Sequence, residues 1–485
     1  MRLDLMGPPL AQLTAPGLRT MLGENTGARP AYAWLSESIR TLVSNGRVLH
    51  GTRLPSEREL VHALGLSRTT VSRAYAELRE RGFAEARRGS GTQIRIPGGS
   101  VGGGAEPLVP GGTDAVAGVL DLTCAAPLAP VGLAGYFERA LDELPGYING
   151  MGYYPNGLPV LREAIAEDYR RRGLPTVPEQ VIVTAGALAG IAITSRALLG
   201  PGARVAVETP TYPNSVASLR QHGSRIIPVS QVTEGSDLPG IEKVLGSRQV
   251  AAMLALPDFH NPTGTLLDAP GRERWAAALR RNSVQGIVDE TNAELWLDAD
   301  PELAPMAAWN RDIVTVSSAS KTYWGGLRLG WIRAPHRVAT ALARAKSTLD
   351  LGAPVLEQLV LAAMLRARPG LDQSTRTGMR EGRDLLLAGL AARLPDWEVR
   401  RPAGGLSLWA NLPLPASTAL SREAEARGLR LAPGSAFAVE SHGLEHWVRI
   451  PYALQGPDLE RALPLLESAW AAAAAGEPAR GRPRA

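Results

Sequence analysis

Hydrophobic and polar residues follow two different patterns along the 485 residues of this chain. Within residues 28–97 the apolar residues recur every three or four positions in short runs, which predicts a small group of amphipathic helices. From residue 119 to residue 475, strand-like apolar runs alternate with helical stretches. This order predicts an α/β domain with a mostly parallel sheet, because parallel strands require helical crossovers between them.

The first two helices of the N-terminal region are predicted from an apolar face and from a start signal. The apolar face of the first helix is formed by Leu35, Ile39, Leu42 and Val43. The second helix is expected to begin at Ser56, which caps it, while Glu59 completes a capping box three residues later. Gly65 is expected to end this short helix.

A third helix is expected to begin after Ser67, which is positioned to cap it, and to close near Gly82. Its core-facing positions have helical spacing and are Val71, Ala74, Tyr75 and Leu78. This register turns Thr69, Ser72 and Arg73 outward.

Two strand-like runs, residues 83–85 and 92–96, flank a basic, glycine-rich turn and predict a β-hairpin. Three helices followed by such a hairpin form a winged helix-turn-helix, whose third helix suits the DNA major groove. Arginines at the hairpin tip suit a phosphate or the minor groove. The alternative is a small helical domain whose polar face is only solvated.

Positive charge is concentrated in the same segment. Residues 28–97 carry 12 Arg and 6 Glu, with neither Lys nor Asp, which gives 12 − 6 = +6. The whole chain carries +5, so the remainder sums to −1. A compact basic module on a near-neutral body is typical of a protein that binds a polyanion such as DNA.

Polar groups follow several of the strands predicted in the larger region. The predicted strands lie at residues 181–183, 204–207, 251–256, 286–288 and 313–316. Asn261, Asp289 and Lys321 follow the third, fourth and fifth of these strands. Small residues around Gly186 follow the first strand and enter a helix whose N–H groups suit a phosphate. Because α/β folds bind ligands at the carboxyl ends of their strands, these groups are expected to share one site.

A lysine, a carboxylate, an amide and a phosphate-binding turn are the parts of a pyridoxal phosphate site, where the lysine forms a Schiff base with the cofactor. Of the three lysines, Lys243, Lys321 and Lys346, only Lys321 has suitable neighbours. Singly, each group also has a structural explanation, since an aspartate often caps a helix and an asparagine often forms a plain turn. Their joint occurrence at successive strand ends favours the cofactor site.

The strings Leu54-Pro55-Ser56-Glu57-Arg58-Glu59-Leu60, Gly65-Leu66-Ser67-Arg68-Thr69-Thr70-Val71 and Gly89-Ser90-Gly91-Thr92 resemble the DNA-binding domain of GntR-family transcription regulators. The resemblance implies that the third helix and the wing contact DNA. Taken with the outward face of that helix, the candidate DNA-binding residues are Arg58, Arg68, Thr69, Thr70, Ser72, Arg73, Arg87, Arg88 and Gly89.

The larger region resembles fold-type I pyridoxal phosphate enzymes of the aspartate aminotransferase class. The matching segments are residues 154–162, Pro210-Thr211-Tyr212-Pro213-Asn214, Asn261-Pro262-Thr263-Gly264, Asp289, Ser318-Ala319-Ser320-Lys321 and Arg449. The resemblance implies that Lys321 forms the Schiff base, Asp289 pairs with the ring nitrogen and Asn261 binds the ring hydroxyl. Tyr212 would stack on the ring, and Arg449 would pair with a ligand carboxylate, a bidentate role that suits arginine. The implied phosphate-binding residues are Gly186, Ala187, Ser318 and Arg328.

The chain departs from this class at three positions. Relatives usually carry a tyrosine two or three positions after the aspartate, where this chain has Thr291 and Asn292. Ala185 stands where a hydroxyl residue is common in the phosphate turn. Loss of that tyrosine is expected to weaken turnover more than cofactor binding. In this class a tyrosine of the partner subunit often reaches the phosphate, and Tyr153 and Tyr154 are both candidates.

From end to end the chain resembles MocR-type regulators, in which a GntR-type winged helix precedes an aminotransferase-like domain. The expected organisation is a DNA-binding domain at 28–97, a flexible Gly/Pro-rich linker at 98–118, an aminotransferase-like effector domain at 119–475 and a disordered tail at 476–485. The second half of the linker has an alternative interpretation as an ordered loop on the larger domain.

The resemblance implies a homodimer that binds operator DNA and responds to pyridoxal phosphate, or to its adduct with an amino compound. One alternative is a working aminotransferase with a DNA-binding domain attached, and another is a regulator that has lost its cofactor. The single cysteine, Cys124, excludes an intrachain disulfide and favours a cytoplasmic protein. Neither a signal peptide, a membrane span nor a metal site is predicted.

Overall fold

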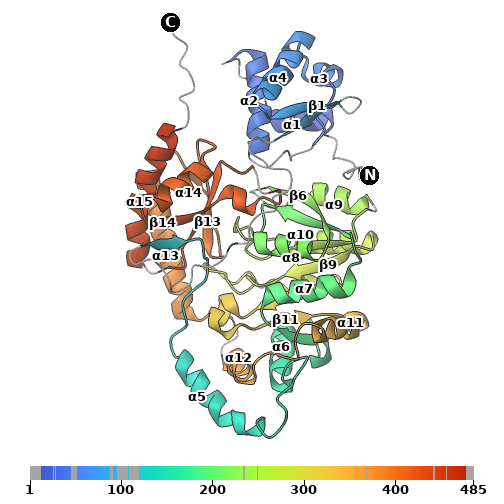
Figure 1. Cartoon of the computed structure of the whole chain (residues 1–485), viewed down its shortest axis with the longest axis vertical. Coiled ribbons are helices and arrows are strands. Elements are labelled where there is room, and N and C mark those ends of the chain that lie inside the picture. The colour runs from blue at the N-terminus through green and yellow to red at the C-terminus, as the bar shows by residue number, and fades with distance from the viewer. Residues whose placement is uncertain are drawn as a thin grey trace, which may run out of the picture.

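The computed structural model of the chain describes residues 13–23, 25, 27, 29–44, 48, 52–87, 91–95, 108, 119–232, 235–236, 238–247, 249–367, 370–440, 443–454 and 456–476. Of the expected linker at 98–118 only Leu108 is among them, and the expected tail is outside them from residue 477 onward. Below, the head means residues 13–95, in blue in Figure 1, and the large unit means residues 119–476. Within the described residues no helix is long and apolar enough to cross a membrane.

The head consists of helices packed beside a short hairpin. Its described elements are α1 (Ala15–Leu22), α2 (Ala31–Ser44), α3 (Glu57–Leu64), α4 (Arg68–Glu80), β1 (Ala84–Arg87) and β2 (Gly91–Ile94). The predicted helix signals are confirmed, since Ser56 and Glu59 form a capping box and Ser67 accepts the Thr70 N–H. Gly65 ends α3 with a φ of 67°, which favours glycine. The hairpin strands pair antiparallel, as predicted.

The core of the head contains every apolar position predicted for its helices. The buried Tyr75 also donates its hydroxyl to the Pro55 carbonyl at 2.8 Å, which joins α4 to the turn before α3. Helix α1 was not predicted, yet Leu18 and Leu22 pack into the same core. Ser72, predicted to point outward, lies outside the core but is half-buried, and its hydroxyl donates to the Glu57 carboxylate on α3.

The larger of two sheets in the large unit has the strand order β4-β11-β10-β9-β8-β5-β6-β7. Its strands are β4 (Val181–Thr184), β5 (Arg204–Thr209), β6 (Arg225–Val232), β7 (Gly235–Ser236), β8 (Ala252–Ala255), β9 (Gln285–Asp289), β10 (Val314–Ser318) and β11 (Gly330–Arg333). Strands β6, β5, β8, β9 and β10 are parallel neighbours, whereas β11 runs antiparallel between β10 and β4. The predicted mostly parallel sheet is therefore confirmed, including all five strands expected from the sequence.

Helices cover both faces of this sheet, as a parallel sheet requires. On one face lie α7 (Ala187–Leu198), α8 (Pro213–Gln221) and α11 (His336–Ser347), and on the other α6 (Pro159–Arg171), α9 (Leu238–Gly246), α10 (Ala269–Arg281) and α12 (Val355–Ala367). Helix α5 (Leu133–Glu143) packs on α12. Successive strand residues enter opposite cores: Val205 and Val207 pack on the α7 side, and Ala206 packs on the α10 side. This alternation fixes which way each strand-end side chain points.

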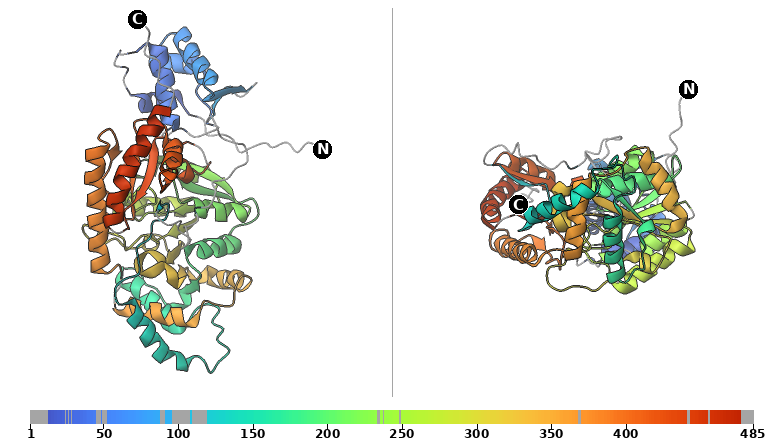
Figure 2. Two further views of the ribbon diagram at one scale, coloured as in Figure 1. Left: turned by 60° about the vertical axis from the view of Figure 1, so that its left-hand side comes forward. Right: turned by 90° about the horizontal axis from the view of Figure 1, so that it is seen from below.

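A second sheet, not predicted from the sequence, has the strand order β12-β13-β15-β14-β3. Its strands are β3 (Leu120–Leu122), β12 (Glu398–Val399), β13 (Ser407–Asn411), β14 (Leu429–Pro433) and β15 (Trp447–Pro451), and the helices packed with it are α13 (Gln373–Arg393), α14 (Ser417–Glu425) and α15 (Gly456–Gly476). Figure 2 shows α13, in orange, and α15, in red, side by side. Gly476 belongs to α15, so the residue expected to begin a disordered tail is helical.

Candidate ligand site and DNA-binding surface

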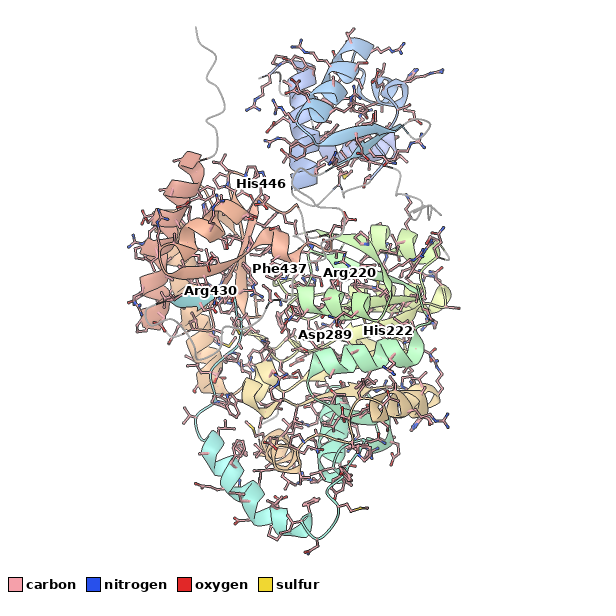
Figure 3. The ribbon with its side chains drawn as sticks, viewed as in Figure 1. Arg220, His222, Asp289, Arg430, Phe437 and His446 are labelled. Carbon is pink, nitrogen blue, oxygen red and sulfur yellow. The ribbon has the colours of Figure 1, made fainter. Side chains whose placement is uncertain are left out.

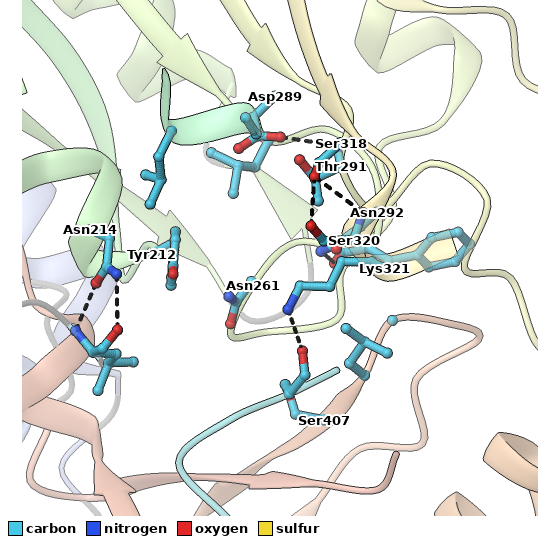
Figure 4. Close-up of a pocket in the computed structure, with 18 of the residues that line it drawn as sticks. Tyr212, Asn214, Asn261, Asp289, Thr291, Asn292, Ser318, Ser320, Lys321 and Ser407 are labelled. Carbon is cyan, nitrogen blue, oxygen red and sulfur yellow. Dashed lines mark hydrogen bonds between the residues drawn. The ribbon is translucent and has the colours of Figure 1, made fainter. Parts of the chain in front are cut away.

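A cavity of about 300 Å³ lies at the carboxyl ends of β4, β5, β8, β9 and β10 (Figure 4). Every side chain or turn predicted for the ligand site lines this cavity, namely Gly186, Ala187, Tyr212, Asn261, Asp289, Ser318, Lys321, Arg328 and Arg449. These residues are spread over more than 260 positions of the chain (449 − 186 = 263), and the sheet brings their strand ends to one edge.

Lys321 lies in the turn that follows β10 and extends into the cavity. Its Nζ donates to the carbonyl of Ala125 at 2.7 Å, and burial lowers the pKa of the amine. The other two lysines are placed differently: Lys346 is buried and paired with Asp350, and Lys243 is exposed on α9. Lys321 is therefore the lysine with a partly desolvated amine at the ligand site, which is the state that favours nucleophilic attack.

Asp289 ends β9 with its carboxylate in the cavity. The Thr291 N–H donates to Oδ1 at 2.9 Å, and burial raises the pKa of the carboxyl group. Among the described residues Asp289 forms no ion pair within 4.0 Å. A cationic group in the cavity would supply the partner that this carboxylate lacks.

The turn from β4 into α7 forms one end of the cavity. Gly186 has a φ of 97° and is the N-cap residue of α7, and no side chain among the described residues caps the first turn of this helix. A Cβ on Gly186 would lie 3.5 Å from a guanidinium nitrogen of Arg328, so this arginine lies over the turn. Gly330 allows β11 to lie close to this turn, since a Cβ on residue 330 would be 2.6 Å from the Gly186 backbone. Free helix N–H groups beside an arginine form a phosphate-binding arrangement.

Arg449 comes from β15 of the second sheet and faces the cavity from the opposite side. The side chain is buried, its guanidinium lies 4.7 Å from the Phe437 ring centroid, and burial lowers its pKa to about 10. Nη1 donates to Oδ1 of Asn261 at 3.2 Å, and Nη2 donates to the Thr123 carbonyl. Nε is buried and has no hydrogen-bond partner among the described residues. Arg449 is thus a buried cation with an open donor, which suits a carboxylate.

The positions that depart from the aminotransferase class also have defined roles here. Asn292 donates to the Phe259 carbonyl at 3.0 Å, so its amide closes a loop. The Thr291 hydroxyl is buried without a partner among the described residues. Both residues line the cavity, and neither supplies the phenol that relatives have there.

Several cavity residues were not predicted. Thr123, Cys124 and Ala125 follow β3, a strand of three residues with no distinctive pattern. Leu108 and Asn214 also line the cavity, although the sequence predicts Leu108 to lie in the linker and assigns Asn214 no role in the site. Each is brought in by contacts between distant parts of the chain, which local patterns do not encode.

The candidate DNA-binding surface is the exposed side of α4 with the first turn of α3. Arg58, Arg68, Thr69 and Arg73 are exposed, whereas Thr70 and Ser72 are half-buried. The Arg73 guanidinium stacks on the Tyr32 ring at 3.7 Å from its centroid, which limits the directions it can take. The side chain of Arg87, and Arg88 and Gly89 as a whole, lie outside the described residues.

Comparison with known proteins identifies both parts of the chain. The family profile for class I and II aminotransferases matches residues 148–465, and that for the gntR family of bacterial regulatory proteins matches residues 31–94. The chain belongs to the class I and II aminotransferase family and is a GntR-family transcription regulator of MocR-like architecture.

Relatives support this assignment along the whole chain. The HTH-type transcriptional regulator YdfD of Bacillus subtilis is 25% identical, with 90% of this chain and 95% of that protein covered. YdcR of Escherichia coli, also an HTH-type transcriptional regulator, is 28% identical, with 86% and 93% covered.

Among solved structures, the α-aminoadipate aminotransferase LysN of Thermus thermophilus, in complex with N-(5′-phosphopyridoxyl)-L-leucine, is 26% identical. It has a TM-score of 0.67, with 75% of this chain and 95% of that chain covered. The large unit of this regulator therefore has the fold of an aminotransferase.

Proposed function

We propose that this regulator binds pyridoxal phosphate in the large unit and operator DNA through the head, and that the ligand alters operator binding. The observation that carries the proposal is the meeting of Lys321, Asp289 and Arg328 in one cavity of a chain with a GntR head. Such a regulator acts in the cytoplasm, where its DNA target is.

Pyridoxal phosphate fits the groups around the cavity. Lys321 supplies the amine for a Schiff base, and Asp289 supplies the buried carboxylate for a protonated ring nitrogen. Arg328, Ser318 and the N–H groups of Gly186 and Ala187 would hold the phosphate. When bound, the cofactor supplies an electron sink at the carbon of an attached amino compound.

The other ring contacts follow from the same geometry. Tyr212 immediately precedes α8 and would stack on the ring, and burial raises the pKa of its phenol, which keeps it neutral. Asn261 would donate its amide nitrogen to the ring hydroxyl, because its Oδ1 already accepts from Arg449.

The effector is either pyridoxal phosphate alone or its adduct with an amino compound. Arg449 favours the adduct, because a buried guanidinium with an open Nε matches a ligand carboxylate. Titration of the protein with both compounds, followed by operator binding, distinguishes the two effectors.

Replacement of Lys321 by alanine tests the cofactor directly. The visible absorbance band of the Schiff base should form in the wild-type chain and be absent from Lys321→Ala, with Lys243→Ala as the matched control. A band that persists in Lys321→Ala would show that the wrong lysine has been chosen. Absence of the band from the wild-type chain would support a regulator that has lost its cofactor.

We further propose a homodimer in which Tyr153 reaches the partner subunit's ligand. Tyr153 is 64% exposed, whereas Tyr154 packs on the core of the large unit and against the Tyr147 ring. Of these two described tyrosines, Tyr153 is therefore the one with a side chain free to cross an interface. Sedimentation should show a dimer, and Tyr153→Phe should weaken cofactor binding more than Tyr154→Phe.

For DNA, Arg58 on α3 and Arg68, Thr69 and Arg73 on the exposed side of α4 would contact the operator. Thr70 and Ser72 would lie at the edge of this surface, and Arg87, Arg88 and Gly89 in the wing. The double variant Arg68→Ala, Arg73→Ala should abolish specific operator binding while the cofactor band is unchanged. Operator affinity that survives this pair of changes would overturn the assignment of α4 as the recognition helix.

A working aminotransferase is the second candidate, because Lys321, Asp289 and Arg449 are all present. A panel of amino donors should give turnover well below about 1 s⁻¹, an ordinary enzymatic rate, if sensing is the main role. Turnover above that rate would favour the enzyme.

A further inference from the structure

Leu108 belongs to the segment that joins the head to the large unit, yet it lines the same cavity as Lys321 and Arg449. Its N–H donates to Oδ1 of Asn214 at 2.7 Å, and its carbonyl accepts from Nδ2 of Asn214 at 2.9 Å. Both hydrogen bonds are drawn in Figure 4. One side-chain amide therefore pairs with both backbone groups of a single residue, 106 positions away, and fixes it in place.

The backbone and the side chain of Leu108 contact different parts of the large unit. Asn214 lies on α8, which packs on the eight-stranded sheet. The leucine side chain packs instead on a buried cluster of the second sheet and of the turn after β14, which consists of Trp409, Ala432 and Phe437. Leu108 therefore lies across the seam between the two sheets.

A carboxylate-bearing ligand would cross the same seam. Its phosphate and ring would contact Arg328 and Lys321 at the edge of the eight-stranded sheet, and its carboxylate would contact Arg449 on β15. Phe437 lies under the Arg449 guanidinium and also belongs to the cluster that holds Leu108. The ligand and Leu108 therefore both stabilise the arrangement in which the two sheets lie close together. Binding of the ligand should strengthen the binding of Leu108, and the reverse should also hold.

We propose that Leu108 is a ligand-binding residue contributed by the interdomain segment, that Asn214 holds it, and that a carboxylate-bearing adduct of pyridoxal phosphate seats it more firmly. The proposal rests on the proposed function for the identity of the ligand. Pyridoxal phosphate alone has no carboxylate for Arg449, so it should seat Leu108 less.

Seating Leu108 limits how far the head can move from the large unit. From Arg95 to Leu108 the chain has 108 − 95 = 13 residue steps, whereas from Arg95 to Val119 it has 119 − 95 = 24. At no more than ~3.4 Å for each step, the maximal reach falls from about 80 Å to about 45 Å. The ligand would thus change the spacing of the DNA half-sites that two heads of a dimer can span.

Hydrogen exchange of the full chain tests the contact between Leu108 and Asn214, because the Leu108 N–H is the donor in one of the two hydrogen bonds that join these residues. Asn214→Asp keeps the acceptor but places a carboxylate oxygen against the Leu108 carbonyl. Asn282→Asp is the matched control, since the Asn282 amide donates to the Ala278 carbonyl in α10, the helix that it follows. The probes are pyridoxal phosphate alone and N-(5′-phosphopyridoxyl)-L-leucine.

We expect the Leu108 amide to exchange about tenfold faster in Asn214→Asp, and at the wild-type rate in Asn282→Asp. In the wild-type chain the phosphopyridoxyl-leucine probe should slow this exchange severalfold, and pyridoxal phosphate alone should slow it less. Leu108→Ala, which keeps the backbone bonds and removes only the seam contact, should lose most of that difference.

An equal exchange rate of the Leu108 amide in the wild-type chain and in Asn214→Asp would overturn the contact between Leu108 and Asn214. An unchanged rate when the phosphopyridoxyl-leucine probe is bound would overturn the coupling between the ligand and Leu108. Neither result involves DNA, so both leave the proposed regulator function standing. Conversely, if the probe slows exchange but never alters operator binding, the regulator proposal fails and Leu108 keeps its role. Failure of both probes to bind would overturn the cofactor site and this proposal together.

Discussion

Replacing Arg449 by methionine should remove the preference of the large unit for ligands that carry a carboxylate. The arginine is 2% exposed, donates to Asn261 and to the Thr123 carbonyl, and keeps its Nε free. Hydrogen bonds to charged groups are each worth ~1.5–3 kcal/mol. A loss of about 2–3 kcal/mol corresponds to a ~30- to 150-fold weaker affinity, since ~1.4 kcal/mol is tenfold.

The assay compares two ligands on two proteins. N-(5′-phosphopyridoxyl)-L-leucine carries the carboxylate, and its decarboxylated counterpart, N-(5′-phosphopyridoxyl)-3-methylbutylamine, does not. Calorimetric titration should give a Kd ratio of ~30 to 150 between the two ligands for the wild-type chain, and a ratio near one for Arg449→Met. The preference should persist from pH 7 to 9, because burial lowers the pKa of Arg449 only to about 10 and the guanidinium stays charged over this range.

Arg430→Met is the matched control. Arg430 lies on β14 of the same sheet, but it is 48% exposed and pairs at 3.7 Å with Asp121 outside the cavity, away from the labelled Asp289 in Figure 3. Its replacement should leave the ratio of the two ligands unchanged. If Arg449→Met weakens both ligands equally, or if Arg430→Met has the same effect, Arg449 does not bind the carboxylate.

Three further substitutions test other parts of the structure. Asp289→Asn should weaken pyridoxal phosphate binding by ~10- to 100-fold in an absorbance titration, because an amide does not stabilise a protonated ring nitrogen; an unchanged affinity would refute that role. Burial raises the pKa of Glu208 to about 8, so the folded chain holds this proton better than the unfolded one and loses stability as the pH rises from about 5 to 8. Glu208→Gln should flatten this loss in Tm measurements, and an identical slope would contradict it. Tyr75→Phe leaves the buried Pro55 carbonyl unpaired and should destabilise the head by about 1–3 kcal/mol in calorimetry, with the cofactor band intact; unaltered unfolding would count against it.

The helices of the head could be predicted because their signals are local. The cap at Ser56, its partner Glu59 and the left-handed Gly65 lie within ten residues of one another and act at short range. Helix α1 has a comparable signal, since Thr14 caps it and Leu18 and Leu22 have helical spacing. The domain predicted from the charge pattern begins at residue 28, so it leaves out α1.

The strand ends of the eight-stranded sheet were also predictable, because a buried parallel strand is a continuous apolar run. The second sheet was not, since β3 contributes three residues and pairs with β14, more than 300 positions away. The seam between the sheets, where Leu108 meets Asn214, depends on such distant pairings. Local sequence patterns therefore predicted the end of the cavity formed by the eight-stranded sheet, but not the end formed by the second sheet, where Arg449 lies.

Operator binding by the full chain, measured with and without ligand, tests most directly whether this chain is a ligand-responsive regulator. The operator can be selected from random duplex DNA and its Kd measured at fixed salt, since phosphate contacts make the affinity depend on salt. With the cavity saturated, as judged from the Schiff-base band, the Kd should change by about fivefold or more, and Lys321→Ala should not respond to pyridoxal phosphate. A Kd that stays the same for the saturated wild-type chain would contradict the coupling of the two sites.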